Sequence, residues 1–244
     1  MGYTYVISDI HGASRAFHKM LKKIELDLEQ DVLIIDGDIV DRGKGSLGLF
    51  FEIMEMRDQH PGHVLVIKGN HELFLEMYMK GTLPWERYSS ENYGGLDTIR
   101  ELEKLSGNEK EKLMTWLEGL PIYKVVDSPV RGELVITHTG LHYSCLVRKL
   151  DGSIDVIRSI EQAYSADPFQ FLICGYIQRE APAVVIRDLD KCLLVGHVPT
   201  MFIADSPTQG IWLKNDKVIM IDCGSSFGGK LGCIRLEDEK IYYT

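Results

Sequence analysis

Five short apolar segments of this chain each run directly into a side chain that can bind a metal ion. They are TYVIS before Asp9, VLIIDG before Asp38, VLVIKG before Asn70, ELVIT before His138 and CLLVG before His197. Short apolar runs of this kind are typical of buried β-strands. In α/β sheets, ligands bind beyond the carboxyl ends of the strands. The sequence therefore predicts a sheet protein in which these five side chains converge.

A sixth side chain of this kind, His11, lies two residues after Asp9. Each residue alone could cap a turn or a helix, or be a core histidine, but their repetition at strand ends favours a metal site. Three imidazoles, two carboxylates and one amide, with no thiolate, suit Mn²⁺, Fe²⁺ or Zn²⁺. Six protein ligands are too many for one catalytic ion, whereas two ions bridged by one carboxylate and a water would use them all.

The apolar periodicity predicts an α/β fold. In the first half of the chain, strands are expected over residues 3–8, 32–36 and 64–68, and helices over residues 14–24, over residues 46–56 and from His71 onward. Ser14 is the expected cap of the first helix. In the second half, strands are expected over residues 123–126, 133–137, 192–195, 210–214, 217–221, 232–236 and 240–243. These strands favour a second, antiparallel sheet layer.

Residues 82–120 have a polar, helical pattern and form a candidate helical insert or lid, with helices expected over residues 98–105 and 110–118. No repeat, low-complexity segment or linker marks a boundary, so we expect a single domain over residues 1–244. A monomer is the default expectation because the chain has no heptad seam.

The chain is acidic, with 27 Lys and Arg against 36 Asp and Glu and a net charge of -9. This balance argues against nucleic acid as the main partner, because duplex binding depends on releasing phosphate counterions. No apolar run approaches the roughly 18 residues of a membrane-spanning helix, and no signal-peptide core follows Met1. We therefore expect a cytoplasmic protein without a membrane partner. The five cysteines include no CxxC pair, which favours free thiols.

Five motifs occur in an order that resembles the calcineurin-like metallophosphoesterases. They are DIHG at residues 9–12, GDIVDRG at 37–43, GNHE at 69–72, HTGL at 138–141 and GH at 196–197. The DRG and GNHE forms resemble the phosphoprotein phosphatase branch, and residues 85–98 and 221–238 resemble its compact bacterial and phage-type members. The resemblance implies an α/β/β/α sandwich, in which two mixed sheets are flanked by helices.

The resemblance also implies roles for individual residues. Asp9 and His11 would bind the first ion, Asp38 would bridge the pair, and Asn70, His138 and His197 would bind the second. His71 would be the general acid that protonates the leaving group, with Asp41 as its partner, and Arg42 would bind phosphate oxygens. The expected cofactor is a pair of divalent ions, Mn²⁺ first, with Fe or Zn as alternatives.

The resemblance also implies a second phosphate-binding arginine between the last two metal histidines. Arg148, Arg158, Arg179 and Arg187 are available there, and Arg179 is the favoured candidate. Two positions depart from the family pattern: Thr139 follows the metal histidine of the fourth motif, and Val198 stands where GHTP is commoner.

The resemblance implies a metal-dependent phosphoric ester hydrolase, a phosphomonoesterase that dephosphorylates phosphoserine and phosphothreonine in proteins. Metal-bound hydroxide would attack phosphorus directly, without a phosphoenzyme. The substrate would be a phosphoprotein or a phosphorylated small molecule. The alternative is a diadenosine tetraphosphatase or another nucleotide phosphohydrolase, a branch that resembles GNHD where this chain has GNHE. A non-catalytic binding module on the same fold is a third reading, which the intact ligand set disfavours.

Two other reaction classes fit the sequence poorly. GSSFG at residues 224–228 matches the serine-hydrolase elbow, but no histidine follows Ser226. Cys174 and Arg179 are separated by four residues, one fewer than in a cysteine-phosphatase loop.

Overall fold

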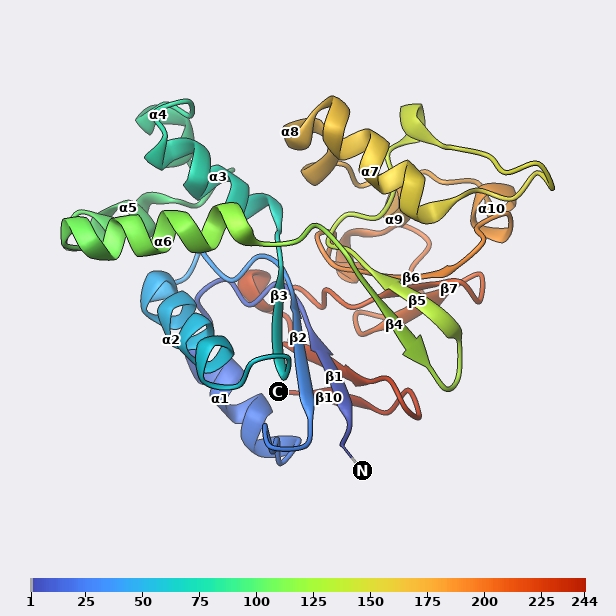
Figure 1. Ribbon diagram of the computed structural model, residues 1–244, viewed down its shortest axis with the longest axis horizontal. Helices are drawn as coiled ribbons and strands as arrows, with labels where there is room; N and C mark the ends of the chain where they lie inside the picture. The colour runs from blue at the N-terminus through green and yellow to red at the C-terminus, as the bar shows by residue number, and fades with distance from the viewer. Residues whose placement is uncertain (1) are drawn as a thin grey trace.

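Two five-stranded mixed sheets form the centre of the molecule. The computed structural model describes residues 2–244. The first sheet has the order β10 (Ile241–Tyr243), β9 (Gly232–Arg235), β1 (Thr4–Ile7), β2 (Val32–Asp36) and β3 (Val64–Ile67). The second has the order β4 (Lys124–Ser128), β5 (Gly132–Ile136), β6 (Cys192–Val195), β8 (Val218–Met220) and β7 (Trp212–Lys214). The predicted α/β/β/α sandwich is confirmed (Figure 1).

The strands that precede the metal-binding residues pair in parallel. In the first sheet β1, β2 and β3 are parallel neighbours, and in the second β5, β6 and β8 are. The antiparallel pairing expected for the second layer occurs only at its edge strands β4 and β7, and its central strands are parallel, which agrees with the mixed sheets that the resemblance implied. The reason is the long connection from β5 to β6, because parallel neighbours require such a crossover.

Helices cover the outer face of each sheet (Figure 1). The helices α1 (Ser14–Lys23), α2 (Ser46–Gln59), α3 (Asn70–Met79), α4 (Trp85–Tyr88), α5 (Leu96–Leu102) and α6 (Gly107–Gly119) contribute to one core with the first sheet. The helices α7 (Val156–Ala166), α8 (Pro168–Leu172), α9 (Tyr176–Arg179) and α10 (Ala183–Arg187) share a second core with the other sheet. Short 3₁₀ turns are η1 (Tyr143–Cys145), η2 (Thr200–Phe202) and η3 (Ser225–Phe227).

A third apolar cluster fills the space between the sheets. Its wholly buried members include Val6, Ile34, Ile67, Leu134, Ile136 and Leu194, which alternate along their strands with residues facing the helices. Sheets packed face to face exclude water from both inner faces. The two sheets therefore hold the ends of their parallel strands at fixed positions relative to one another.

The sequence did not predict α7 to α10. Three of these helices have five residues or fewer, which is too short for a clear helical period. The predicted cap at Ser14 is wrong: Ala13 precedes the helix without a side-chain cap bond, and the Ser14 hydroxyl pairs with His18 Nδ1 at 3.2 Å.

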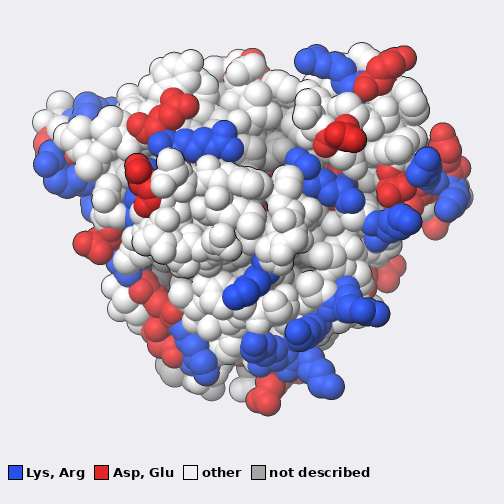
Figure 2. Space-filling view, turned by 180° about the vertical axis from the view of Figure 1, so that it is seen from behind, with Lys and Arg blue, Asp and Glu red and all other residues white. Residues whose placement is uncertain are grey.

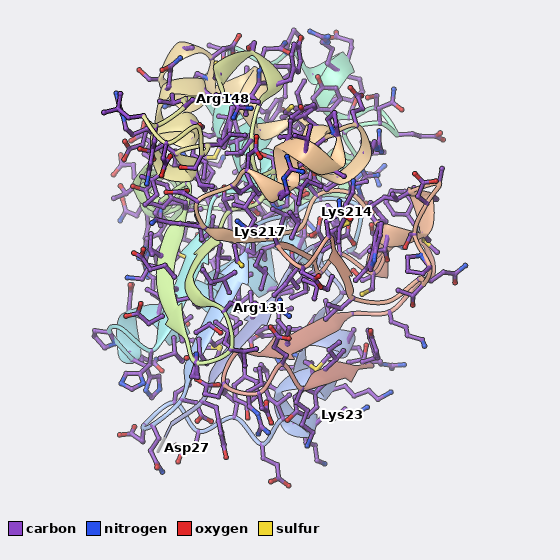
Figure 3. All side chains as sticks on the ribbon, turned by 90° about the vertical axis from the view of Figure 1, so that its right-hand side faces the viewer. Lys23, Asp27, Arg131, Arg148, Lys214 and Lys217 are labelled. Atoms are coloured by element: carbon purple, nitrogen blue, oxygen red, sulfur yellow. The ribbon has the colours of Figure 1, made fainter. Side chains whose placement is uncertain are left out.

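Ion pairs connect elements that are distant in sequence. Buried Lys68 lies 2.7 Å from Glu76 of α3, which Lys80 also contacts at 2.7 Å. Arg131 of the β4–β5 turn holds both carboxylate oxygens of Glu239 at 2.5 and 2.8 Å, which joins the two sheets (Figure 3).

The charge of the molecule is unevenly distributed over its surface. In Figure 2 most of the charged side chains surround a broad area without Lys, Arg, Asp or Glu, and Lys and Arg gather toward the lower right. An acidic total charge therefore coexists with a locally basic surface. No helix in residues 2–244 is long and apolar enough to cross a membrane.

Candidate active site

The loops after the parallel strands have an unusual backbone conformation. Six non-glycine residues there have positive φ: Asp9 (53°), His11 (48°), Asp38 (54°), Asp41 (70°), Arg42 (64°) and His197 (68°). Positive φ is uncommon for residues with a Cβ and costs free energy, so it persists only where the surrounding structure requires it. These sharp turns aim the side chains at a common region between the ends of the two sheets.

Glycines allow the loops to approach one another closely. A Cβ at Gly37 would lie 2.7 Å from Gly69 Cα and 2.8 Å from His138 Nδ1. A Cβ at Gly196 would overlap the carboxylate of Asp9. Any side chain at these positions would push the metal-binding loops apart.

Asp38 occupies the centre of the site. Its Oδ2 lies 3.2 Å from His138 Nε2, 3.6 Å from His11 Nε2 and 4.0 Å from His71 Nε2. The carboxylate is buried, and its Oδ1 accepts the backbone N–H of His71 at 3.0 Å. Asp38 therefore faces imidazoles that follow strands of both sheets, at the centre of the cluster where a bridging ligand was expected.

The remaining predicted ligands complete the cluster. Asn70 Oδ1 lies 2.8 Å from His197 Nδ1 and 3.1 Å from His138 Nε2. Both oxygens of the Asp9 carboxylate lie 3.2 Å from the backbone nitrogen of His197. The structure thus brings together all six residues that the sequence singled out.

Backbone carbonyls orient two of the imidazoles. His11 Nδ1 lies 3.0 Å from the Val40 carbonyl, and His138 Nδ1 lies 2.7 Å from that of Asp36. Such partners fix the ring and leave Nε2 free to bind a metal ion. Imidazole, carboxylate and amide groups converging in this way fit a pair of borderline or hard divalent cations. Asp38 belongs to two groups of side chains that could each hold a metal ion. One group contains His11 and His71, and the other contains His138 and His197.

The electrostatics of the cluster keep several groups ready to bind cations. Burial, together with the charge of a neighbouring imidazolium, lowers the pKa of His11 and of His197 to about 3, so both are neutral. Burial alone would raise the pKa of Asp38, but His138 and His71 outweigh it and hold that pKa well below its usual range. Burial and the charge of Asp38 raise the pKa of Asp9 to about 7, although His138 opposes them.

His71 and Asp41 form a buried pair beside the cluster. His71 Nδ1 lies 2.8 Å from Asp41 Oδ2, and Asp41 is wholly buried. Burial would lower the pKa of His71, but the carboxylates of Asp38 and Asp41 outweigh it and raise this pKa. His71 can therefore hold a proton that faces the cluster.

Two hydroxyl groups to which the sequence assigned no role hold Asp41. Tyr88 of α4 and Thr98 of α5 donate to Asp41 Oδ1 at 2.7 and 2.6 Å. Both residues are wholly buried. They lie 47 and 57 residues from Asp41 in the chain, so no local pattern could have predicted their contact with this carboxylate. Residues 82–120 thus supply contacts to the partner of His71.

Glu72 has a structural role in the same loops. Its carboxylate accepts backbone N–H groups of Asp38 and Ile39 at 2.8 Å and of Gly69 at 2.9 Å. These bonds tie the loop after β2 to the loop after β3. The side chain is wholly buried and its carboxylate is taken up by backbone N–H groups, so its role here is to hold the two loops together.

Arg42 is held in place from two sides. Its backbone N–H donates to Gly94 O at 2.9 Å, and its Nη2 donates to Asn92 O at 3.3 Å. Its guanidinium carbon lies 4.9 Å from the ring centroid of Phe227. A guanidinium with this support keeps donors available for phosphate oxygens.

Arg179 lies at the end of α9, which is bonded to the metal-binding loops. Its neighbour Gln178 is wholly buried and donates to Thr139 O, beside His138, and to Gly196 O, beside His197, both at 3.2 Å. Lys214 Nζ donates to the carbonyl of Gln178 at 3.0 Å (Figure 3). Arg179 itself is exposed, and no side-chain partner is found for it within residues 2–244. Sequence reasoning missed the linking role of Gln178.

Ion pairs engage two of the other candidate arginines. Arg148 and Arg187 lie 3.1 and 3.4 Å from the carboxylate of Asp188. Figure 3 shows Arg148 near the helical end of the molecule.

This fold and cluster define a metal-dependent phosphoric ester hydrolase. The calcineurin-like phosphoesterase family matches residues 3–220, and the chain belongs to this family, whose members are dinuclear and metal-dependent. A protein from Salmonella arizonae named bis(5′-nucleosyl)-tetraphosphatase, symmetrical, is 28% identical, and the match covers 98% of this chain and 93% of that protein.

Solved structures share the fold. A structure described as a candidate diadenosine tetraphosphatase has a TM-score of 0.59 at 16% identity and covers 100% of this chain and 93% of that chain. A protein serine/threonine phosphatase from Saccharomyces cerevisiae has a TM-score of 0.64 at 16% identity. The match covers 100% of this chain and 79% of that chain. At such identities the likeness shows the fold alone, and that fold occurs in proteins with different named substrates.

The names of the sequence relatives overturn the expected protein phosphatase activity. The relative aligned over almost the whole chain is named for a dinucleotide substrate, so phosphoserine and phosphothreonine in proteins, and a phosphoprotein as substrate, are not supported. The expectation depended on the DRG and GNHE forms and on the resemblance of residues 85–98 and 221–238 to compact phosphatases. The Glu72 carboxylate of GNHE accepts backbone N–H groups of the neighbouring loops, so it has a structural role in this site.

Proposed function

We propose that this protein hydrolyses bis(5′-nucleosyl) tetraphosphates symmetrically, cutting the central phosphoanhydride to release two nucleoside diphosphates. The observation that carries the proposal is the full-length similarity to a protein named symmetrical bis(5′-nucleosyl)-tetraphosphatase. The site supports it with groups that suit a polyphosphate. These are the cluster that would hold two cations, Arg42 beside it, and exposed Arg179, for which no side-chain partner is found within residues 2–244.

The proposed roles are those that the family resemblance implies, and the convergence of these side chains supports them. Asp9 and His11 would hold one ion, Asp38 would bridge, and Asn70, His138 and His197 would hold the other. Mn²⁺ is our proposal for the ions, because hard oxygen donors and imidazoles both bind it. When bound, such a pair would supply Lewis-acid chemistry, neutralising phosphoryl oxygens and lowering the pKa of water.

The protein's own groups position the substrate and move a proton. Arg42 would bind the oxygens of the phosphoryl group under attack, and Arg179 those further along the chain. His71 would give the proton on Nε2 to the departing diphosphate, while Asp41 holds Nδ1 and stabilises the imidazolium. We also propose that residues 1–244 act as one domain, since residues 82–120 support Asp41.

A direct test compares kcat/KM of Mn²⁺-loaded protein on diadenosine tetraphosphate and on a phosphothreonine peptide. The products of the dinucleotide are separated by ion-exchange chromatography, and chelator-treated protein is the control. We expect preference for the dinucleotide and ADP as the sole nucleotide product. Release of AMP with ATP would contradict symmetrical cleavage, and preference for the peptide would contradict the proposed substrate.

A further inference from the structure

Two exposed aromatic side chains stand beside Arg42. Phe202 is 54% exposed and Phe227 is 46% exposed. Their ring centroids lie 5.2 Å apart with an interplanar angle of 79°. One of the two rings, Phe227, also contacts the guanidinium of Arg42, with 4.9 Å from the guanidinium carbon to the ring centroid. Adjacent exposed aromatic rings next to a phosphate-binding side chain indicate a ligand surface.

The aromatic pair is built into the loops of the metal-binding cluster. Phe202 ends η2, five residues after His197. Phe227 ends η3, whose Ser225 hydroxyl donates to the carbonyl of Asp9 at 2.5 Å. Both rings therefore have fixed positions relative to the place where the phosphates bind. The GSSFG segment, which resembled a hydrolase elbow in sequence, serves here as the support of an aromatic ring.

A hollow of about 580 Å³ adjoins Phe202. Residues 200–204 and 206–209 line it, and they include the polar side chains of Ser206, Thr208 and Gln209. The volume falls within the range of small-molecule sites. A nucleobase has flat apolar faces and a polar edge, so a site with one aromatic wall and nearby hydroxyl and amide groups matches its chemistry.

We infer that Phe202 and Phe227 form a nucleobase subsite, in which the base stacks on Phe202 while Arg42 holds the phosphate chain of the same nucleotide. The inference rests on the proposed function and extends it by naming the residues that recognise the nucleoside. Base stacking on aromatic side chains is tolerant of base identity, because every base has a π-face. The subsite therefore accepts adenine, guanine and pyrimidine nucleotides alike.

Calorimetric binding tests this inference without turnover. The ligands are ADP and inorganic pyrophosphate, which lacks the base, and the proteins are wild type, Phe202→Ala and Phe202→Trp, all with Mn²⁺. We expect Phe202→Ala to weaken ADP binding about tenfold and pyrophosphate binding much less, and Phe202→Trp to restore ADP binding. Tyr3→Leu, which removes an exposed ring at the opposite end of β1, is the matched control. Equal losses for both ligands, or unchanged ADP binding, would overturn the subsite.

Kinetics separate this inference from the proposed function. If wild type cleaves diadenosine tetraphosphate and Phe202→Ala leaves its KM unchanged, the subsite is wrong and the function stands. If wild type does not cleave the dinucleotide but ADP binding depends on Phe202, the proposed function is wrong and the subsite stands. We expect Phe202→Ala to lower kcat/KM for the dinucleotide relative to that for p-nitrophenyl phosphate.

Discussion

Replacing Tyr88 with Phe removes one of the two hydroxyls that hold Asp41. The phenol donates to Asp41 Oδ1 at 2.7 Å, and Thr98 donates to the same oxygen at 2.6 Å. Phe keeps the buried ring, which packs on Tyr78 with centroids 5.0 Å apart. The change therefore isolates one hydrogen bond to a buried carboxylate. Such bonds to charged groups contribute about 1.5–3 kcal/mol, so we expect a loss of about 2 kcal/mol in the free energy of unfolding.

Urea and thermal unfolding followed by circular dichroism measure this loss. For a chain of this length, a loss of about 2 kcal/mol lowers Tm by about 4–8 °C. Tyr78→Phe is the matched control, because it removes a hydroxyl from the same aromatic pair and no hydrogen-bond partner of that hydroxyl is found in residues 2–244. Equal losses in the two variants, or a change within about 0.5 kcal/mol for Tyr88→Phe, would refute the proposed link between residues 82–120 and Asp41.

The same substitution has an expected effect on turnover. With one donor lost, Asp41 is held less firmly and orients His71 less well. We expect kcat to fall more for alkyl phosphates than for p-nitrophenyl phosphate, whose leaving group needs little protonation. A change in KM alone, with kcat unchanged on both substrates, would show that the hydroxyl does not act through His71.

Four further outcomes are expected. Asp38→Asn should reduce the metal content below two ions per chain, measured by atomic emission, because the bridge loses its charge; two retained ions would contradict bridging. His71→Asn should keep both ions yet slow alkyl phosphate hydrolysis about 10²- to 10⁴-fold, and equal slowing of p-nitrophenyl phosphate would remove it as the acid. Arg179→Ala should raise KM for diadenosine tetraphosphate several-fold, whereas Arg187→Ala, an exposed arginine paired with a neighbouring aspartate, should not. Although burial opposes it, hydrogen bonds from two lysines lower the pKa of Glu76. Wild type should therefore have a higher free energy of unfolding than Glu76→Gln at pH values above the unfolded-state pKa of about 4.3. This difference should disappear as pH falls through the lower folded-state pKa of Glu76. A difference in the free energy of unfolding that stays constant from pH 7 to 3 would contradict the pairing with the lysines.

Local pattern was sufficient for the strands and for the residues at their ends. The predicted strand at residues 32–36 matches β2, and the one at 192–195 matches β6. Strands of a parallel sheet are buried on both faces, so they have continuous apolar sequences of this length, which a local pattern can identify. The helices α8, α9 and α10 were missed because helices this short are stabilised mainly by packing on the sheet and leave little helical pattern in the sequence.

The amino-acid order by itself determined which side chains follow each parallel strand and so which groups could converge: Asp9, Asp38, Asn70, His138 and His197. Only the tertiary structure decided what supports them. Asp41 accepts hydrogen bonds from hydroxyls of α4 and α5, and the carboxylate of Glu72 accepts backbone N–H groups. The physical reason is the sequence separation over which each feature is determined. Strand periodicity is a local property, whereas a hydrogen bond between residues about 50 positions apart depends on how the packed helices place them.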